Sequence, residues 1–218
     1  NVTTTCVLLP FVKLLVKCSC AVIKDKKETG ETLTLKYVDD RLLTTPPVAL
    51  MQVKKEIEYM LTLVEENTRL SFAVVDNGST EHGETIQNNE QLINFINRAL
   101  TQFLIKLSAN VEESDEKTIG TYFHVLNDLE RIGDNAENFH EIGVEMLKKN
   151  IMFSDNAHSG ITEMRANIMQ MFAIAKDAFV NVNKGELPKL AVLEETVDGE
   201  KKAFIASHFA RLAEGNCS

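Results

Sequence analysis

Proline and glycine, the residues that break helices, are scarce in this chain, with only four prolines and ten glycines among its 218 residues. Tryptophan is absent from the sequence. Such a composition favours helices over strands and turns. Apolar residues make up 44% of the sequence, so a sizeable core can be buried. The length allows one or two ordinary domains. We therefore expect an all-α protein.

Cysteine is equally scarce. Cys6, Cys18 and Cys20 lie in an apolar segment near the start and Cys217 lies near the end, without a Cys-x-x-Cys spacing. This pattern argues against a zinc ribbon or a thioredoxin-type redox motif. Free thiols in a reducing compartment are the expected state.

Basic charge is also in short supply after the first residues. Residues 1–24 hold Lys13, Lys17 and Lys24 and no acid, whereas the rest of the chain carries a net charge of −12. Neutralisation of phosphates supplies most nucleic-acid affinity, so a body this acidic argues against a nucleic-acid partner. It suits the binding of a cation or of another protein.

One apolar run stands out, Cys6–Ile23, with Lys13 and Lys17 inside it. Its length is near the minimum for a membrane span, and two lysines add a cost of about 2.5–3.5 kcal/mol each at mid-membrane. The run predicts the end of a membrane helix, with a soluble amphipathic helix or a signal sequence as alternatives. Lys24, Lys26 and Lys27 follow at once, which places the remainder in the cytoplasm if the run spans a membrane.

Apolar residues then recur with the helical period in five segments. The expected helices are Val48–Val75, Glu84–Leu107, Glu116–Lys148, Ile161–Val182 and Leu187–Ala213. Thr45 and Asp115 are the expected N-caps of the first and third. Before them, the alternation in Thr32–Val38 predicts a short strand.

The third expected helix carries two informative stripes. Its inner stripe alternates steps of four and three residues and contains His140, expected to be a packing residue, together with Tyr122, Leu126, Leu129, Gly133, Ala136, Gly143 and Leu147. Glycines on that stripe let a neighbouring helix approach closely. A second stripe holds Glu130, Asp134, Glu137 and Glu141, whose like charges repel at this spacing. The stripe is either a solvated acidic face or a site for a compensating cation.

The order of helices also indicates a weak internal duplication. The first two expected helices match the last two in length and order, and only the first half has a third helix before the sequence stops. Two antiparallel three-helix bundles, the second incomplete, are the expected architecture.

Several segments resemble the PhoU family, and more narrowly the PhoU-like tail of bacterial sodium/phosphate cotransporter proteins. Asp128–Asn138 (DLERIGDNAEN) resembles the signature of the third helix in that family. Asp39–Met60 is similar to the linker that enters the first bundle, and Leu193–Lys201 (LEETVDGEK) to a carboxylate pair on a second helix. His208–Cys217 resembles the end of that helix, and Asn1–Pro10 with the following apolar run resembles a last membrane helix.

This resemblance implies metal sites at paired acidic motifs on the two bundles, with iron or zinc as the family metals. Its ligands would be Glu130 and Asp134 with Glu90 in the first bundle, and Glu194 and Asp198 in the second. Oxygen-rich sites by themselves also suit manganese or magnesium. Asn94 stands where the family has an acidic residue, and an amide is a weaker ligand.

The second pair has a simpler alternative. Lys201 and Lys202 follow Asp198 at i+3 and i+4, the spacing of ordinary helical ion pairs. Local ion pairing then explains Glu194 and Asp198 without a metal.

The resemblance implies residues 1–23 as a last membrane helix, 24–45 as a linker, 46–150 as a first bundle and 155–218 as a truncated second bundle. It implies a regulatory, non-enzymatic tail of a sodium-dependent phosphate transporter in the cell membrane, cytoplasmic after about residue 24. The transporter's membrane region is then its partner in cis, and homo-oligomerisation is open. The alternative is a soluble PhoU-like metal-binding regulator of phosphate transport and signalling. No Ser/His/Asp order or glycine-rich phosphate loop points to an enzyme.

Overall fold

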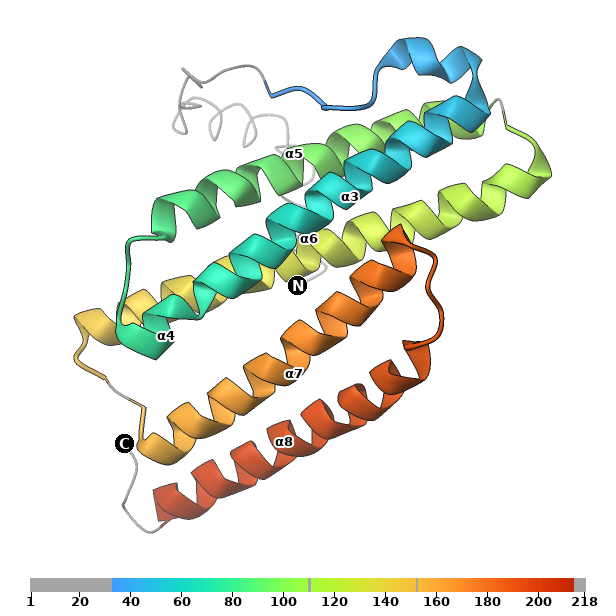
Figure 1. The fold of residues 1–218 in the computed structure, drawn as a ribbon. Coiled ribbons are helices and arrows are strands. Elements are labelled where there is room, and N and C mark those ends of the chain that lie inside the picture. Colours follow the sequence, from blue (N-terminus) through green and yellow to red (C-terminus); the bar gives the residue numbers. More distant parts are fainter. Residues whose placement is uncertain (1–32, 110, 152, 214–218) are drawn as a thin grey trace, which may run out of the picture. The chain divides into compact units, whose positions relative to one another are not determined.

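The computed structural model describes residues 33–109, 111–151 and 153–213, and within these it is all-helical (Figure 1). A short 3₁₀ helix, η2 (Asp40–Thr44), leads into α3 (Pro46–Ser71) and its short continuation α4 (Ala73–Asn77). Then follow α5 (Gly83–Ser108), α6 (Glu113–Lys148), α7 (Asp155–Val180) and α8 (Leu187–Ala213). The all-α expectation is confirmed.

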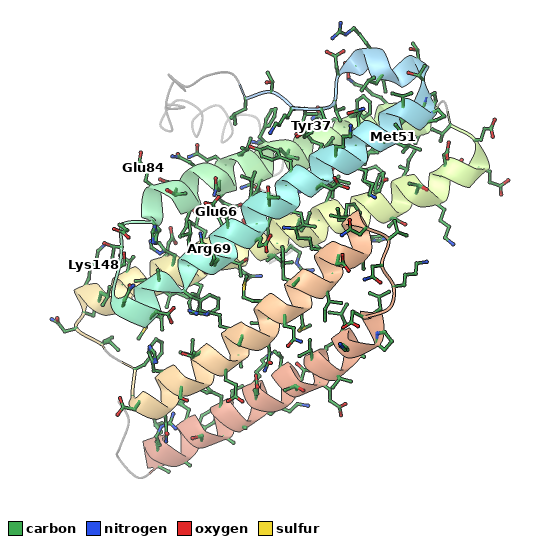
Figure 2. The ribbon with its side chains drawn as sticks, in the orientation of Figure 1. Tyr37, Met51, Glu66, Arg69, Glu84 and Lys148 are labelled. Atoms are coloured by element: carbon green, nitrogen blue, oxygen red, sulfur yellow. The ribbon has the colours of Figure 1, made fainter. Side chains whose placement is uncertain are left out.

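The helices α3, α5 and α6 form an antiparallel three-helix bundle. Arg69 near the end of α3, Glu84 at the start of α5 and Lys148 at the end of α6 lie at the same end of it (Figure 2). Each helix contributes one apolar stripe to a shared core. Its fully buried members include Val53, Ile57, Met60 and Val64 of α3, Ile93, Leu100 and Leu104 of α5, and Leu126 of α6.

The glycines on the inner stripe of α6 mark its closest approaches to neighbours. A Cβ at Gly143 would lie 2.3 Å from Cγ1 of Val74 in α4. His140 and the other predicted inner residues are buried, except Leu147, which is 39% exposed because it lies in the last turn. The predicted stripe is therefore confirmed up to that turn.

Several predicted boundaries are corrected. The first helix breaks at Phe72, and the chain turns after α4 at Gly78, whose φ of +70° favours glycine. The third begins at Glu113, so Asp115 lies within its first turn and is not the N-cap. Thr45 is the N-cap residue of α3, as predicted, although its hydroxyl donates back to the Leu42 carbonyl and makes no cap bond.

The strand predicted for Thr32–Val38 is wrong for residues 33–38, the part that the structure describes. A buried carboxylate takes the backbone donors that a strand partner would need. Glu56 of α3, 1% exposed, accepts from the N–H of Lys36 at 3.1 Å and of Tyr37 at 2.6 Å. The Lys36 ammonium also lies 4.6 Å from the ring centroid of Tyr59. This segment is fixed to α3 by its backbone (Figure 2, where Tyr37 is labelled).

The helices α7 and α8 form an antiparallel hairpin, with Ser154 as the N-cap of α7 accepting from the N–H of Ala157. This N-cap replaces the later start predicted at Ile161. Arg165 pairs with Asp76, Lys176 pairs with Glu65, and Lys54 donates to the carbonyl of Val180 at 3.1 Å. Through these contacts α7 lies beside the first bundle, while α8 packs on α7.

None of the helices in the described part of the chain is long and apolar enough to cross a membrane. The apolar run Cys6–Ile23, on which the membrane prediction depends, lies outside the described residues.

Candidate functional site

Glu90 of α5 is the centre of the candidate site. Its side chain is buried against α6, with 3% of the residue exposed. The amide of Asn94, one turn later on α5, donates to Glu90 Oε1 at 2.9 Å. Glu90 Oε2 is also buried and has no hydrogen-bond donor in the described residues. One oxygen of this carboxyl is thus satisfied and the other is left for a proton or a cation.

Gly133 of α6 makes room for this carboxyl. A Cβ at this position would lie 2.7 Å from Glu90 Oε2 and 3.3 Å from Cδ1 of Ile93. A larger residue there would require the end of the Glu90 side chain to shift. The glycine in the Arg-Ile-Gly segment of the third helix therefore has a direct packing role at the site.

The acidic stripe of α6 flanks Glu90. Glu130, Asp134 and Glu137 are half-buried, and Glu141 is exposed. Burial is the main cause that raises the pKa of Glu130, with the charge of Asp134 adding to it and Arg131 opposing it. Burial also raises the pKa of Glu137, helped by Glu141 and Asp134.

The pKa of Glu90 is the most perturbed. It is raised to about 8, first by burial, then by its hydrogen-bonding proximity to Asp134 and by the charges of Asp134, Glu137 and Glu130. Two ionised carboxylates have no proton to share in a hydrogen bond, whereas a proton on Glu90 lets it donate to Asp134. The arrangement therefore retains a proton near neutral pH or favours a cation that replaces it.

The structure brings three of the predicted ligands together, Glu90 of α5 with Glu130 and Asp134 of α6. However, no three His, Cys, Asp or Glu side chains in the described part of the chain are arranged to hold a metal ion as they stand. The orphaned buried Glu90 oxygen and the acidic donors fit a hard cation. The Asn94–Glu90 hydrogen bond, in contrast, occupies one of the oxygens that a metal would use.

The second predicted pair lies elsewhere. Glu194 and Asp198 are both exposed on α8. Among the residues that the structure describes, neither forms an ion pair with Lys201 or Lys202, so the local pairing expected as an alternative is absent as well. The two residues are solvated side chains on an open helix face.

Two further features of the bundle were not recognised from the sequence. Glu137 and His140 form a Glu-x-x-His spacing, a pattern that helical bundles use for metal ligands, and it was visible in the sequence. His140 is 6% exposed and its Nδ1 has no partner in the described residues. Burial and the charge of His82 lower the His140 pKa, against the opposing effect of Glu141. His140 also lines a surface hollow of about 690 Å³ between α5 and α6.

Glu56 is the other missed group, because its partners are backbone N–H groups of a segment far from it in the sequence. No spacing rule on α3 could have identified it. It has a structural role, since both of its oxygens are satisfied.

Comparison with known families agrees with this geometry. Residues 57–142 match the model of the PhoU domain, a segment that runs from α3 through α5 to near the end of α6. No curated protein matches the chain, and neither does any solved structure. The matched segment contains Glu90, Asn94, Glu130 and Asp134, and it ends before α7 and α8. Residues 57–142 are therefore similar to the PhoU domain, a likeness that covers less than half of the chain.

Proposed function

We propose that this chain is the cytosolic regulatory tail of a sodium-dependent phosphate transporter. The observation that carries the proposal is the PhoU-like domain at residues 57–142 in a chain that also has the apolar run Cys6–Ile23. Lys24, Lys26 and Lys27 directly follow that run, which favours a cytoplasmic position for everything after it. The partner is then the membrane region of the transporter.

The acidic groups of the bundle offer a means of regulation. The candidate site is a group of carboxyls between α5 and α6. Its protonation state or cation occupancy changes the charge between α5 and α6. That change is a means by which the bundle can respond to the ionic conditions of the cell.

We propose further that the Glu90 region binds a metal cation, through Glu90, Glu130 and Asp134. Iron, zinc, manganese and magnesium are the candidates. Bound there, the ion would supply the positive charge that lets the carboxyls remain ionised next to one another. Asn94 would orient Glu90 from the opposite oxygen. Glu194 and Asp198 are both exposed on α8, so they are the weaker site.

Membrane fractionation tests the transporter assignment. The chain, expressed with a C-terminal tag, should stay in the membrane pellet after an alkaline carbonate wash. Leu14→Glu combined with Leu15→Glu should move it to the soluble fraction. A matched control, Val48→Glu with Met51→Glu at exposed positions of α3, should leave it in the pellet. Recovery of the unaltered chain as a soluble protein would favour the alternative, a soluble PhoU-like regulator.

Elemental analysis tests the metal separately. The purified chain should contain metal that is lost in the pair Glu130→Gln and Asp134→Asn. The pair Glu112→Gln and Glu116→Gln has the same spacing at exposed positions around the start of α6, and it should keep the metal. An equal metal content in both pairs would reject Glu130 and Asp134 as ligands, without bearing on the membrane assignment.

A further inference from the structure

His140 of α6 is a buried titratable group that takes no part in the proposed cation site. Only 6% of the residue is exposed. Its Nδ1 is enclosed and has no hydrogen-bond partner among the described residues. Its Nε2 lies beside the start of α5, since a Cβ at Gly83 would be 3.1 Å from that atom. The imidazole is therefore packed between two helices with one nitrogen unsatisfied.

The enclosure of Nδ1 favours the neutral form of the ring. A neutral imidazole has one N–H, and with that proton on Nε2 the buried Nδ1 is only an acceptor. A second proton would make Nδ1 a buried donor without an acceptor, which is a costly state. Burial accordingly lowers the pKa of His140, with the charge of His82 adding to the effect and Glu141 opposing it.

Acidic side chains lie next to the ring, in the hollow between α5 and α6. The hollow has a volume of about 690 Å³, and His140 lines it together with Glu137 and Glu141 of the same helix. Its other charged residues stand farther along α6: Glu145, Lys148 and Lys149. Of these, Glu145 and Lys149 pair with each other. The hollow therefore has room for an imidazole ring and carboxylates that can accept from it.

The other elements around His140 place a base near the inward ring and acids that are engaged elsewhere. The turn before α5 brings His82, whose Nε2 lies 3.4 Å from Glu81. On the α4 side Asp76 pairs with Arg165. The remaining acids at this end of α3 and α5 are paired or exposed: Glu65 with Lys176, Glu66 with Asn89, and Glu84 in solvent.

The start of α5, where Figure 2 labels Glu84, has few other attachments. The side chain of its N-cap residue, His82, makes no capping bond. From Ile86 onward the helix is anchored, because Ile86 is fully buried and its carbonyl accepts from the Asn67 amide of α3 at 3.0 Å. The turn before Ile86 can therefore open while the core of the bundle stays intact.

We propose that His140 is a pH-sensitive switch at this end of the bundle. When neutral, its ring packs inward against Gly83 and holds the first turn of α5. When protonated, it rotates into the hollow, donates to Glu137 or Glu141, and releases that turn. A proton is assigned rather than a metal ion, because no three His, Cys, Asp or Glu side chains converge on an ion in the described part of the chain. The inference does not depend on the role in phosphate transport.

The direction of the effect follows from the two positions of the ring. The outward ring has at least the ordinary histidine pKa of 6.5, and the inward ring has a lower pKa. The inward state binds fewer protons, so acid favours the outward state. Between the two pKa values, the ratio of outward to inward rings rises up to about tenfold for each pH unit. Glu90, with a pKa of about 8, is already mostly protonated below pH 7 and changes little in this range.

Amide hydrogen exchange of the full chain in a mild detergent tests the switch. The reporter is Ile86, whose N–H bonds to the His82 carbonyl at 2.9 Å across the first turn of α5. After correction for intrinsic exchange, its protection should fall about tenfold from pH 7 to pH 5.5. His140→Gln cannot gain a proton and should have equal protection at both values. The matched control His124→Gln, at an exposed position of the same helix, should keep the fall.

Two neighbours should move the midpoint of this response in opposite directions. His82→Gln removes a like charge and should raise the midpoint pH, whereas Glu141→Gln removes an attractive charge and should lower it. Asp128→Asn, at an exposed position of α6, should leave the midpoint unchanged. None of these three residues is buried, so circular dichroism should show the same helix content in all variants.

Three results would overturn the proposal. One is equal protection of Ile86 at pH 7 and pH 5.5 in the unaltered chain. Another is a fall that persists in His140→Gln, which would assign the response to the carboxyls of α6. The third is a fall that disappears in His82→Gln, because the response would then come from a proton on His82 that is repelled by the positive end of α5.

Discussion

The first bundle and the α7/α8 hairpin are built from helices of similar length, yet they differ in what they bury. The bundle encloses a continuous core, and most of its buried residues lie where three helices meet. In the hairpin only Ala157 and Ile174 are buried, both in α7. In a pair of helices each helix has one interface and buries one face. In a bundle of three, each helix packs against two others and buries a second face. The stability of the chain should therefore reside in the bundle.

Replacing one leucine in the bundle and one in the hairpin is the strongest test of this difference. Leu104→Ala in α5 removes a fully buried side chain and should lower the free energy of unfolding by about 2–5 kcal/mol. Leu212→Ala in α8, 48% exposed, should change it by less than about 0.5 kcal/mol. Urea unfolding followed by circular dichroism measures both. Equal losses would show that the hairpin has a core of its own.

Glu90 in the bundle and Glu194 in the hairpin should differ in how they affect the pH dependence of stability. In the folded, metal-free chain Glu90 has a pKa of about 8 and keeps its proton below that pH. In the unfolded chain it loses the proton at its ordinary pKa of 4.5. The folded state then binds more protons, so this group makes stability fall as the pH rises from about 4.5 to 8. Glu90→Gln should remove that decline and stabilise the chain by roughly 2–4 kcal/mol above pH 8.

The control for this prediction is Glu194→Gln on α8. Glu194 is exposed, so its replacement should leave the pH dependence of unfolding unchanged. Thermal unfolding in a chelating buffer from pH 4 to pH 9 measures both variants. A Glu90→Gln variant with the same pH slope as the unaltered chain would contradict the protonated state of Glu90.

The two regions also differ in how closely other side chains pack against their glycines. Gly143→Ala places a methyl group 2.3 Å from Cγ1 of Val74, a β-branched residue with little freedom to move, and should cost about 1–3 kcal/mol. Gly199→Ala in α8 meets no atom within 4 Å and should stabilise the helix by about 0.5–1 kcal/mol. Chemical unfolding distinguishes the two signs. A destabilising Gly199→Ala would reveal a neighbour on α8.

The ion pairs between hairpin and bundle should contribute least. Lys176 and Glu65 are each about one-third exposed, so Lys176→Ala should lower stability by about 0.2–1 kcal/mol. The loss should shrink as salt is added, because exposed charges are screened. Lys189→Ala, which removes a pair within the hairpin, is the control and should have no larger effect. A loss that is insensitive to salt would mean that Lys176 acts through packing.

The sequence predicted α3, α5 and α6 well because each has a clear apolar period, and the start of α8 at Leu187 was placed correctly. The inner stripe of α6 and the role of its glycines followed from the same period. What it could not predict depended on distant contacts. The N–H groups of Lys36 and Tyr37 bond to a carboxylate twenty and nineteen residues away, which no local pattern reveals.

The candidate site was predicted in part for the same reason. Spacing on α6 identified Glu130 and Asp134 as neighbours, and the family resemblance added Glu90 from another helix. The burial of Glu90 depends on the packing of α5 on α6, which spacing does not reveal. Its bond from Asn94, in contrast, is an i, i+4 contact within α5. From the sequence, Asn94 was interpreted as a weaker ligand in place of an acidic residue. In the structure its amide donates to the Glu90 carboxyl and orients it.

The attachment of the leading segment to Glu56 has a mechanical consequence. A pull on the chain just before Lys36 reaches α3 through Glu56, several turns inside the helix, before it can reach Pro46 at the helix start. The load therefore acts across the bundle core, where Ile57 and Met60 adjoin the loaded residue. Because the bonds come from backbone N–H groups, the side chains at positions 36 and 37 can vary while this route of force is retained.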